Sequence, residues 1–255
     1  MSLIEETLEG TINRIDIAIE RLKCFEPPEG YYLAFSGGKD SIVLYKLAEI
    51  SGVKFDAHFN LTTVDPPELL RFIKEFYPEI EWHKPEKSMF SLIEEEGIPP
   101  TAIMRYCCKY LKERGGIGRI VLTGIRGEES IRRKSRKIVE NCIRFKTKSF
   151  VNPIIDWSSG DVWDFIKKKK LKYCSLYDEG YKRIGCIMCP MMTIKDRLRD
   201  KNRYPKFYKA YLLAFKKMLE RRKIKGKTNS WKTPEDVMNW WIYKQSKQKQ
   251  DTLFN

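Results

Sequence analysis

The sequence contains one glycine-rich segment with the composition of a phosphate-binding loop: Ser36, Gly37, Gly38, Lys39, Asp40 and Ser41. It follows the apolar run 31–35, which predicts a buried strand, and it leads into residues 40–50, which predict a helix. Glycine reaches backbone conformations closed to other residues, and the N–H groups at a helix start point at a bound anion. The common P-loop spacing is absent, because the glycines are adjacent and an aspartate separates lysine from serine. The segment therefore indicates phosphate chemistry of another class.

The cysteines are the second group of residues whose types and spacing could support chemistry. Four of the seven cysteines lie in two close pairs: Cys107, Cys108, Cys186 and Cys189. The second pair is a C-x-x-C knuckle between glycine and proline, which can offer two thiolates to one metal centre. On spacing alone three interpretations stay open. An iron–sulfur cluster tolerates the diverging side chains of adjacent cysteines, a zinc ion would use the same thiolates, and the thiols could simply be buried.

Charge is distributed unevenly along the 255 residues. Residues 1–125 hold 15 Lys+Arg against 20 Asp+Glu, and residues 126–255 hold 34 against 14. The basic half predicts a polyanionic partner, a nucleotide or a nucleic acid, although a solvated lysine-rich surface would give the same excess. No segment reaches the ~18 consecutive apolar residues of a membrane span, and the first residues do not resemble a signal peptide. We expect a cytoplasmic protein without membrane contact, in which disulfides are not expected.

Strand and helix patterns alternate in the first half of the chain. Strands are predicted at 31–35, 54–60, 80–83 and 119–123, and helices at 40–50, 67–77, 88–95 and 105–114. This alternation predicts an α/β fold with a doubly wound parallel sheet, whose ligands bind at the carboxyl ends of the strands.

Helical patterns flank this region. An apolar face predicts a helix at 8–23, residues 193–224 read as helical, and Thr233 followed by Pro234 predicts another helix start. Residues 150–155 predict an edge strand. We therefore predict three parts: an N-terminal helix at 1–30, a nucleotide-binding domain with the metal site at 31–192, and a helical C-terminal extension at 193–255.

The glycine-rich segment resembles the PP-loop of the adenine nucleotide α-hydrolase-like superfamily. Further segments are similar to the phosphoadenylyl-sulfate (PAPS) reductase family, in order: 105–108 (RYCC), 123–130 (TGIRGEES), 152–157 (NPIIDW), 161–163 (DVW) and 176–181 (LYDEGY). The resemblance covers about residues 31–192 and implies a Rossmann-like sheet.

The resemblance also implies roles for single residues. The PP-loop, 36–41, would grip a nucleotide phosphate or the sulfate joined to it. The segment 61–65, with candidates Thr62, Thr63 and Asp65, would contact the adenosine. Arg126 would face the anion, since arginine makes bidentate contacts that lysine cannot. Candidates for binding a 3′-phosphate, with a solvated basic loop as the alternative, are Arg132, Arg133, Arg136 and Lys137.

Family members that reduce adenylyl sulfate (APS) carry Cys-Cys and Cys-x-x-Cys around a [4Fe–4S] cluster. The resemblance therefore implies such a cluster on Cys107, Cys108, Cys186 and Cys189. Lys112 has the position of a lysine that those members keep between cluster and sulfate, so Lys112 and Arg126 are candidates for anion stabilisation. The usual reductases attack with a cysteine in a C-terminal motif. No cysteine follows Cys189 here, and the nucleophile stays unassigned, since we expect the remaining thiols to be buried or incidental: Cys24, Cys142 and Cys174.

Two functions follow from the resemblance. The first is an oxidoreductase of sulfate assimilation that reduces PAPS or APS to sulfite, with a thioredoxin-like or other electron donor. The second is an ATP pyrophosphatase-type sulfuration enzyme acting on DNA (phosphorothioation) or tRNA, which the basic half favours. Aromatic residues of the extension could stack bases or form core or dimer contacts: Trp231, Trp240, Trp241 and Tyr243. A nucleotide-binding scaffold is a third interpretation. Family members are often oligomers, so we expect a homo-oligomer, a dimer.

Overall fold

The computed structural model describes residues 3–7, 10–142, 147–227 and 230–243. The chain folds into two compact units. Unit 1 comprises Met1–Asn60, Pro67–His83 and Gly115–Ile184, and unit 2 comprises Leu61–Pro66, Lys84–Arg114 and Gly185–Asn255. The sequence predicts a division into three parts, 1–30, 31–192 and 193–255, and this division stays a prediction. Residues 244–255 of the third part lie outside the described residues.

Unit 1 is built on a six-stranded sheet with the strand order β5-β4-β3-β6-β8-β7. Neighbouring strands are parallel except for β7, which is antiparallel to β8. The predicted α/β fold is therefore confirmed, with one antiparallel edge strand that the sequence did not indicate. The predicted edge strand at 150–155 is β8, which lies inside the sheet. In chain order the strands are β3 (Tyr31–Ala34), β4 (Phe55–Asn60), β5 (Glu81–His83), β6 (Ile120–Leu122), β7 (Val139–Asn141) and β8 (Ser149–Val151).

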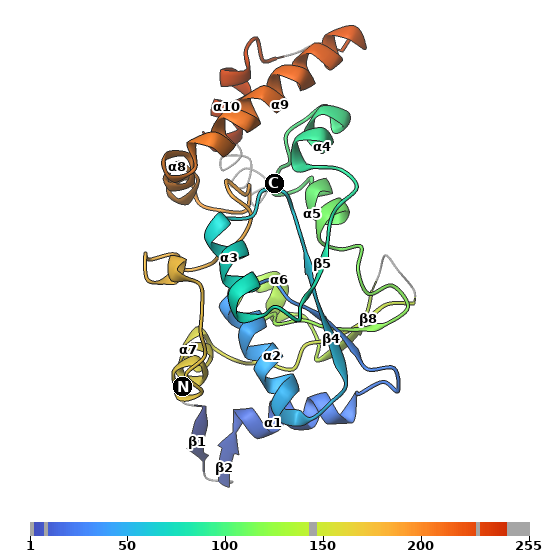
Figure 1. Cartoon of the computed structure of the whole chain (residues 1–255), viewed down its shortest axis with the longest axis vertical. Coiled ribbons are helices and arrows are strands. Elements are labelled where there is room, and N and C mark those ends of the chain that lie inside the picture. The colour runs from blue at the N-terminus through green and yellow to red at the C-terminus, as the bar shows by residue number, and fades with distance from the viewer. Residues whose placement is uncertain (1–2, 8–9, 143–146, 228–229, 244–255) are drawn as a thin grey trace. The chain divides into compact units, whose positions relative to one another are not determined.

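Helices cover this sheet. α2 packs against both α1 and α7 (Figure 1). Tyr31, Tyr32 and Leu33 of β3 are all buried, as expected for an interior parallel strand that is covered on both faces. The helices of unit 1 are α1 (Arg14–Cys24), α2 (Lys39–Ser51), α3 (Pro67–Phe76), α6 (Ile131–Lys134) and α7 (Ser159–Lys168), with single 3-10 turns η1 (Gly127–Glu129) and η2 (Ser175–Tyr177).

The N-terminal segment differs from the predicted helix at 8–23. β1 (Ile4–Thr7) and β2 (Gly10–Asn13) form an antiparallel hairpin, and the helix begins only at Arg14. The Asn13 side chain accepts a hydrogen bond from the Ile15 N–H at 3.1 Å, which caps the helix there. The β-branched pair Thr11 and Ile12 favours the strand before it. The helical spacing of Ile12 with later apolar residues was therefore misleading.

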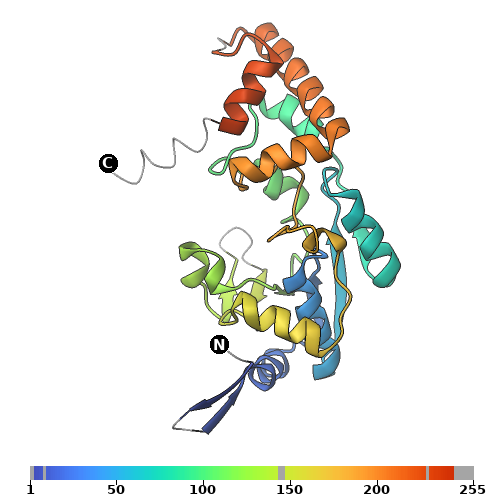
Figure 2. The same ribbon diagram turned by 90° about the vertical axis from the view of Figure 1, so that its left-hand side faces the viewer.

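The regular secondary structure in the described residues of unit 2 is helical. The predicted helix at 193–224 is two helices, because Pro205 cannot continue α8 and instead begins α9. The predicted start at Thr233 is confirmed, since its hydroxyl accepts from the Asp236 N–H at 3.1 Å. α9 packs against α4 and α10, as both views show (Figures 1 and 2). The helices are α4 (Met89–Glu96), α5 (Tyr106–Leu111), α8 (Ile194–Arg203), α9 (Pro205–Ile224) and α10 (Pro234–Tyr243).

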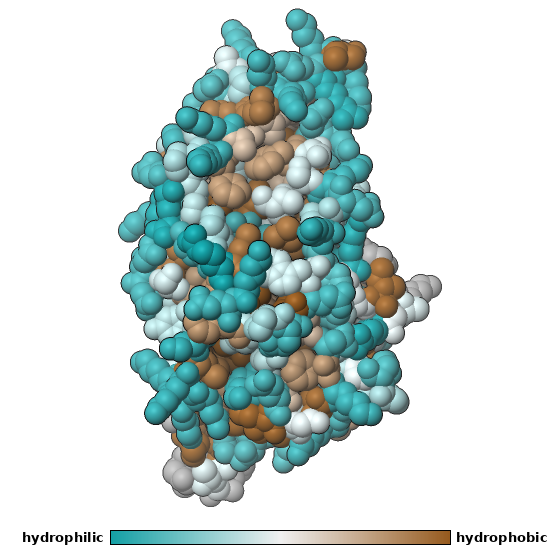
Figure 3. Space-filling view, in the orientation of Figure 1, coloured by the Kyte–Doolittle hydropathy of each residue, from teal (hydrophilic) through white to brown (hydrophobic). Residues whose placement is uncertain are grey.

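No described helix is long and apolar enough to cross a membrane. Figure 3 shows a face on which hydrophilic residues predominate, in keeping with the 33% of charged residues in the chain.

Trp241 anchors the core of unit 2. Its side chain is fully buried among Tyr211 and Phe215, with ring centroids 4.9 and 5.5 Å away. Its indole N–H donates to the Pro100 carbonyl at 2.7 Å. Trp241 is thus a core residue rather than a base-stacking one. Trp231 and Trp240 are half-buried and pack edge to face at 5.0 Å, whereas Tyr243 is exposed.

We predict that Trp241→Ala destabilises unit 2 by about 3–5 kcal/mol, because it opens a cavity and removes the hydrogen bond to the Pro100 carbonyl. Urea-induced loss of helical circular dichroism measures the change. Asn239→Ala, at an exposed position of the same helix, is the control and should stay within about 0.5 kcal/mol of wild type. Equal midpoints for the two variants would contradict the anchoring role.

Candidate functional site

The PP-loop is a tight turn between β3 and α2. Gly37 has φ 68°, a conformation that favours glycine, and a Cβ at this position would lie 2.7 Å from Leu69 Cδ1 and displace that side chain. The Ser41 hydroxyl donates to the Gly38 carbonyl at 2.9 Å and accepts from the Ser36 N–H at 3.2 Å. These bonds hold the loop around the first turn of α2, whose N–H groups form the positive end of the helix dipole.

The charged residues of the loop are partly engaged. Lys39 is buried, and its ammonium lies 2.9 Å from the Asp40 carboxylate. The other Asp40 oxygen accepts from Arg126 Nε at 2.6 Å. Arg126 is also buried, and its Nη1 donates to Glu128 at 2.7 Å. The structure thus brings Arg126 to the PP-loop, where it pairs with two carboxylates and fixes the orientation of Asp40.

Tyr177 is a site residue that the sequence did not single out. Its hydroxyl accepts a hydrogen bond from the Lys39 N–H at 2.9 Å, at the start of α2. Burial raises the pKa of Tyr177, so the phenol stays protonated. Trp163 packs edge to face on its ring at 5.2 Å. Both residues belong to the segments that resemble the reductase family, and that resemblance was the available signal.

The predicted adenosine-contacting segment belongs to unit 2 rather than to the sheet. Thr62 and Asp65 are buried, and the Asp65 carboxylate accepts from the Thr62 N–H at 2.6 Å. Thr63 has φ 65°, and its hydroxyl accepts from the Met89 N–H at 2.9 Å. Burial raises the pKa of Asp65, and the nearby Lys112 opposes this effect. The segment is therefore a rigid polar turn.

The four paired cysteines lie in the same unit as this turn. Cys186 and Cys189 sit on a tight knuckle closed by a hydrogen bond from the Cys189 N–H to the Cys186 carbonyl at 3.2 Å. The Cys186 thiol lies 3.5 Å from the Thr62 hydroxyl. Cys107 and Cys186 are buried, whereas Cys108 and Cys189 are half-buried. All four belong to one apolar cluster, so tertiary structure brings together segments about eighty residues apart.

The C-terminal helices support the knuckle. The Met188 N–H, in a residue with φ 57°, donates to the Asp200 carboxylate of α8 at 2.8 Å. The Tyr211 hydroxyl of α9 donates to the Ile187 carbonyl at 3.1 Å. Neither contact could be predicted from a local pattern, since only the fold brings Asp200 and Tyr211 to the cysteines.

Two cations face the thiols. Arg105 donates to Cys108 Sγ at 3.4 Å. A hydrogen bond from the Cys107 thiol, and then the charges of Arg105 and Lys112, lower the pKa of Cys108. The charge of Cys186 and then that of Asp65 raise the pKa of Lys112, and its exposed side chain stays protonated. Lys112 is therefore an accessible cation near the cysteines.

The other candidate residues lie on the surface of unit 1. Arg132 and Lys137 are exposed. Arg133 pairs with Glu129, and Arg136 pairs with Glu140. These two pairs fit the solvated basic loop better than a phosphate site. Among the remaining thiols Cys174 is buried, Cys142 is half-buried and Cys24 is exposed.

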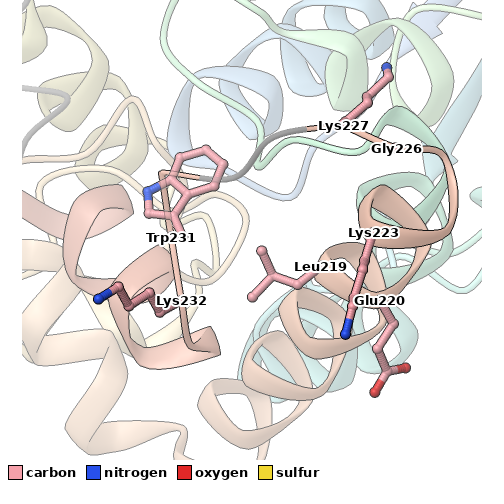
Figure 4. Close-up of a pocket in the computed structure, with 7 residues that line it drawn as sticks. All are labelled: Leu219, Glu220, Lys223, Gly226, Lys227, Trp231 and Lys232. Carbon is pink, nitrogen blue, oxygen red and sulfur yellow. The ribbon is translucent and has the colours of Figure 1, made fainter.

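A basic hollow of about 400 Å³ lies at the end of α9 in unit 2. Figure 4 shows Leu219 extending from α9 toward Trp231. The hollow combines an aromatic ring with several amines, and its lining consists of Leu219, Glu220, Lys223, Gly226, Lys227, Trp231 and Lys232.

Solved structures resemble this fold at low sequence identity. The PAPS reductase of Candida auris in its phosphate complex aligns with a TM-score of 0.52 and 20% identity, over 72% of this chain and 97% of that one. The FMN adenylyltransferase of Candida glabrata with FAD and pyrophosphate aligns with a TM-score of 0.50 and 16% identity, over 69% of this chain and 62% of that one. At these identities the likeness shows the fold alone.

Sequence relatives are more similar. Two uncharacterized proteins of Methanocaldococcus jannaschii are 31% and 28% identical over 72% and 75% of this chain, which spans 47% and 42% of their length. An adenosine 5′-phosphosulfate reductase of Oceanobacillus iheyensis is 32% identical over 61% of this chain and 69% of the reductase. A probable FAD synthase of Schizosaccharomyces pombe is 30% identical over 71% of this chain and 69% of the synthase.

The family comparison agrees with the motifs. The sequence profile of the phosphoadenosine phosphosulfate reductase domain matches residues 30–192, a range that contains the PP-loop, Arg126, Tyr177 and all four paired cysteines. The chain therefore belongs to the phosphoadenosine phosphosulfate reductase domain family.

Proposed function

We propose that this protein reduces an adenylyl sulfate, APS or PAPS, to sulfite and the corresponding adenosine phosphate. The observation that carries the proposal is the grouping of the four paired cysteines with Lys112 and the Thr62–Asp65 turn in unit 2. The relatives named as adenosine 5′-phosphosulfate reductases support the same activity.

The PP-loop supplies the nucleotide-binding half of this function. The turn at Gly37 leaves the first N–H groups of α2 and the buried Lys39 ammonium at one end of a helix. Helix N-termini and a nearby cation favour phosphate or sulfate groups. Arg126 acts here as a positioning residue, because its guanidinium binds Asp40 and Glu128.

The cysteines fit a [4Fe–4S] cluster better than a single zinc ion. A tetrahedral zinc with Zn–S bonds of about 2.3 Å draws its sulfurs to about 3.8 Å from one another. The charges of these cysteines affect one another's pKa values, which fits thiols that lie near one another. The side chains of adjacent cysteines diverge, and a cluster that is several ångströms across accommodates this better than one small ion. Once bound, the cluster would supply a fixed charged centre, with an electrostatic and structural role.

The proposed reaction transfers two electrons to sulfur. The S–O bond to the nucleotide phosphate breaks, sulfite leaves, and the phosphate oxygen keeps the bonding pair. A thioredoxin-like dithiol is the class of donor that can supply two electrons and the accompanying protons. Lys112, which is protonated and accessible, is the residue of unit 2 suited to stabilise an anionic group. We assign no attacking thiol.

A second candidate is an ATP-using sulfuration enzyme acting on DNA or tRNA. The hollow of Figure 4 favours it, because an aromatic ring flanked by lysines can stack a base and contact a phosphate. The relative named as a probable FAD synthase supports nucleotide chemistry of this kind. The cysteine grouping supports the reductase over this alternative, and we keep the reductase as the proposed function.

An anaerobic assay separates the two candidates. Iron-reconstituted protein with a reduced low-potential dye is incubated separately with PAPS, APS and ATP. We expect dye oxidation and sulfite from PAPS or APS. Pyrophosphate from ATP alone, increased by DNA or tRNA, would replace the reductase with the sulfuration enzyme.

Lys39→Ala should weaken nucleotide binding by about 1.5–3 kcal/mol, the range for hydrogen bonds to charged groups, which is roughly ten- to hundredfold in Kd. Calorimetric titration with APS, PAPS and ATP measures it. Lys46→Ala is the control, since this lysine lies on the same helix but its side chain is 38% exposed and pairs with Glu49. Unchanged affinity of Lys39→Ala would remove the PP-loop from the binding site.

Cys186→Ser should remove the brown colour and the bound iron of the purified protein, because one of four cluster ligands is lost. Iron analysis and the visible spectrum measure the loss, and Cys24→Ser, at an exposed cysteine outside the site, should keep both. A wild-type protein that takes up no iron on anaerobic reconstitution would exclude the cluster.

A further inference from the structure

The two histidines of the chain face each other on neighbouring strands of unit 1. The chain has two histidines, His58 and His83. His58 lies on β4 directly opposite Glu81 of β5, and His83 follows two residues later on β5. Because side chains alternate between the faces of a sheet, these three residues share one face. The two histidines and a carboxylate therefore meet at one point.

Their ligand atoms all lie within 4.8 Å of one another, close enough to share one metal ion. His58 Nδ1 lies 2.8 Å from His83 Nε2. Glu81 Oε2 is 3.4 Å from His58 Nδ1, and Glu81 Oε1 is 3.6 Å from His83 Nε2. A tetrahedral zinc ion with bonds of about 2.0–2.1 Å holds its ligand atoms about 3.3 Å apart. The three groups can converge on one ion with small side-chain adjustments.

The second ring nitrogen of His58 is also engaged. His58 Nε2 contacts the Asp56 carboxylate, which in turn accepts two hydrogen bonds from Arg119 at 2.7 and 2.5 Å. A carboxylate at one ring nitrogen holds the proton there and leaves the lone pair of the other for a metal. Tyr32 stacks on the His58 ring at 3.9 Å with an interplanar angle of 4°. The ring is thus fixed with Nδ1 directed at His83 and Glu81.

The site is closed on one side and open on the other. The side chain of His58 is 7% exposed, whereas those of His83 and Glu81 are 37% and 64% exposed. An ion can therefore enter from solvent, and a water molecule can complete its coordination. The alternative without a metal is a single hydrogen bond in which the two imidazoles share one proton.

We propose that His58 Nδ1, His83 Nε2 and a Glu81 oxygen bind one divalent transition-metal ion of the Zn²⁺ type, with Asp56 as the supporting carboxylate. Imidazole and carboxylate ligands suit such ions. The ion ties β5, a three-residue strand at the edge of the sheet, to β4. Its ligands all belong to unit 1, whereas the paired cysteines belong to unit 2. The proposal is therefore independent of the cluster and of the reductase function.

Labelling histidine alone with ¹⁵N gives a direct test on the full chain. Only the two imidazoles contribute signals, and zinc bound by the cysteines adds no histidine signal of its own. On titration with ZnCl₂ we expect the His58 Nδ1 and His83 Nε2 resonances to move to metal-bound positions and to saturate at one ion per chain. Imidazole resonances that stay unchanged while zinc is in excess would show a simple hydrogen-bonded pair and overturn the proposal.

Variants test the geometry. Asp56→Asn should weaken zinc binding at the imidazoles by about 10–100-fold, the usual effect of losing a supporting carboxylate. Glu81→Gln should weaken zinc binding at least as much. Because Glu81 is exposed, this variant stays folded, and it tests the ligand set even if Asp56→Asn unfolds through loss of the Asp56–Arg119 pair. Glu75→Gln, at an exposed carboxylate of α3, is the control. Wild-type zinc affinity in Glu81→Gln would overturn the proposed ligand set.

Discussion

The ion pair between Arg126 and Asp40 is the constraint on which the nucleotide-binding end of unit 1 depends. Arg126 is 3% exposed, and losing one partner of a buried ion pair is strongly destabilising. Its second carboxylate partner, Glu128, also accepts the Ser159 N–H at the start of α7. One guanidinium thereby links the loop after β6 with the starts of two helices. The PP-loop is positioned by this network as much as by its own glycines.

Unit 2 shows the same principle with hydrogen bonds to the backbone. The C-x-x-C knuckle has little structure of its own, and α8 and α9 hold it through Asp200 and Tyr211. The Ile187 N–H donates to the Val64 carbonyl at 2.8 Å, which joins the knuckle to the polar turn at Thr62–Asp65. The C-terminal helices thus form the framework of the cysteine site. This explains why Tyr211, Phe215 and Trp241 are so completely buried.

The relatives of this chain include an adenosine 5′-phosphosulfate reductase and a probable FAD synthase. In the proposed function the sheet and the PP-loop bind the adenosine phosphate part of the substrate. What distinguishes a member is the set of groups placed beside that core. In this chain those groups are the cysteines with Lys112, and it is on them that the proposed reduction rests. The histidine pair, on an edge strand and its neighbour, is a separate feature.

The sequence by itself determined the α/β class, most strands, the PP-loop and the two cysteine pairs, since these depend on local periodicity and spacing. It missed the N-terminal hairpin and the antiparallel strand β7, because pairing with a distant segment decides such short strands. Tertiary structure alone showed that Arg126 binds Asp40, that Tyr177 reaches Lys39 and that His58 meets His83. These contacts join residues 25 to 138 positions apart. No local pattern records such distances, because they are set by the packing of whole elements.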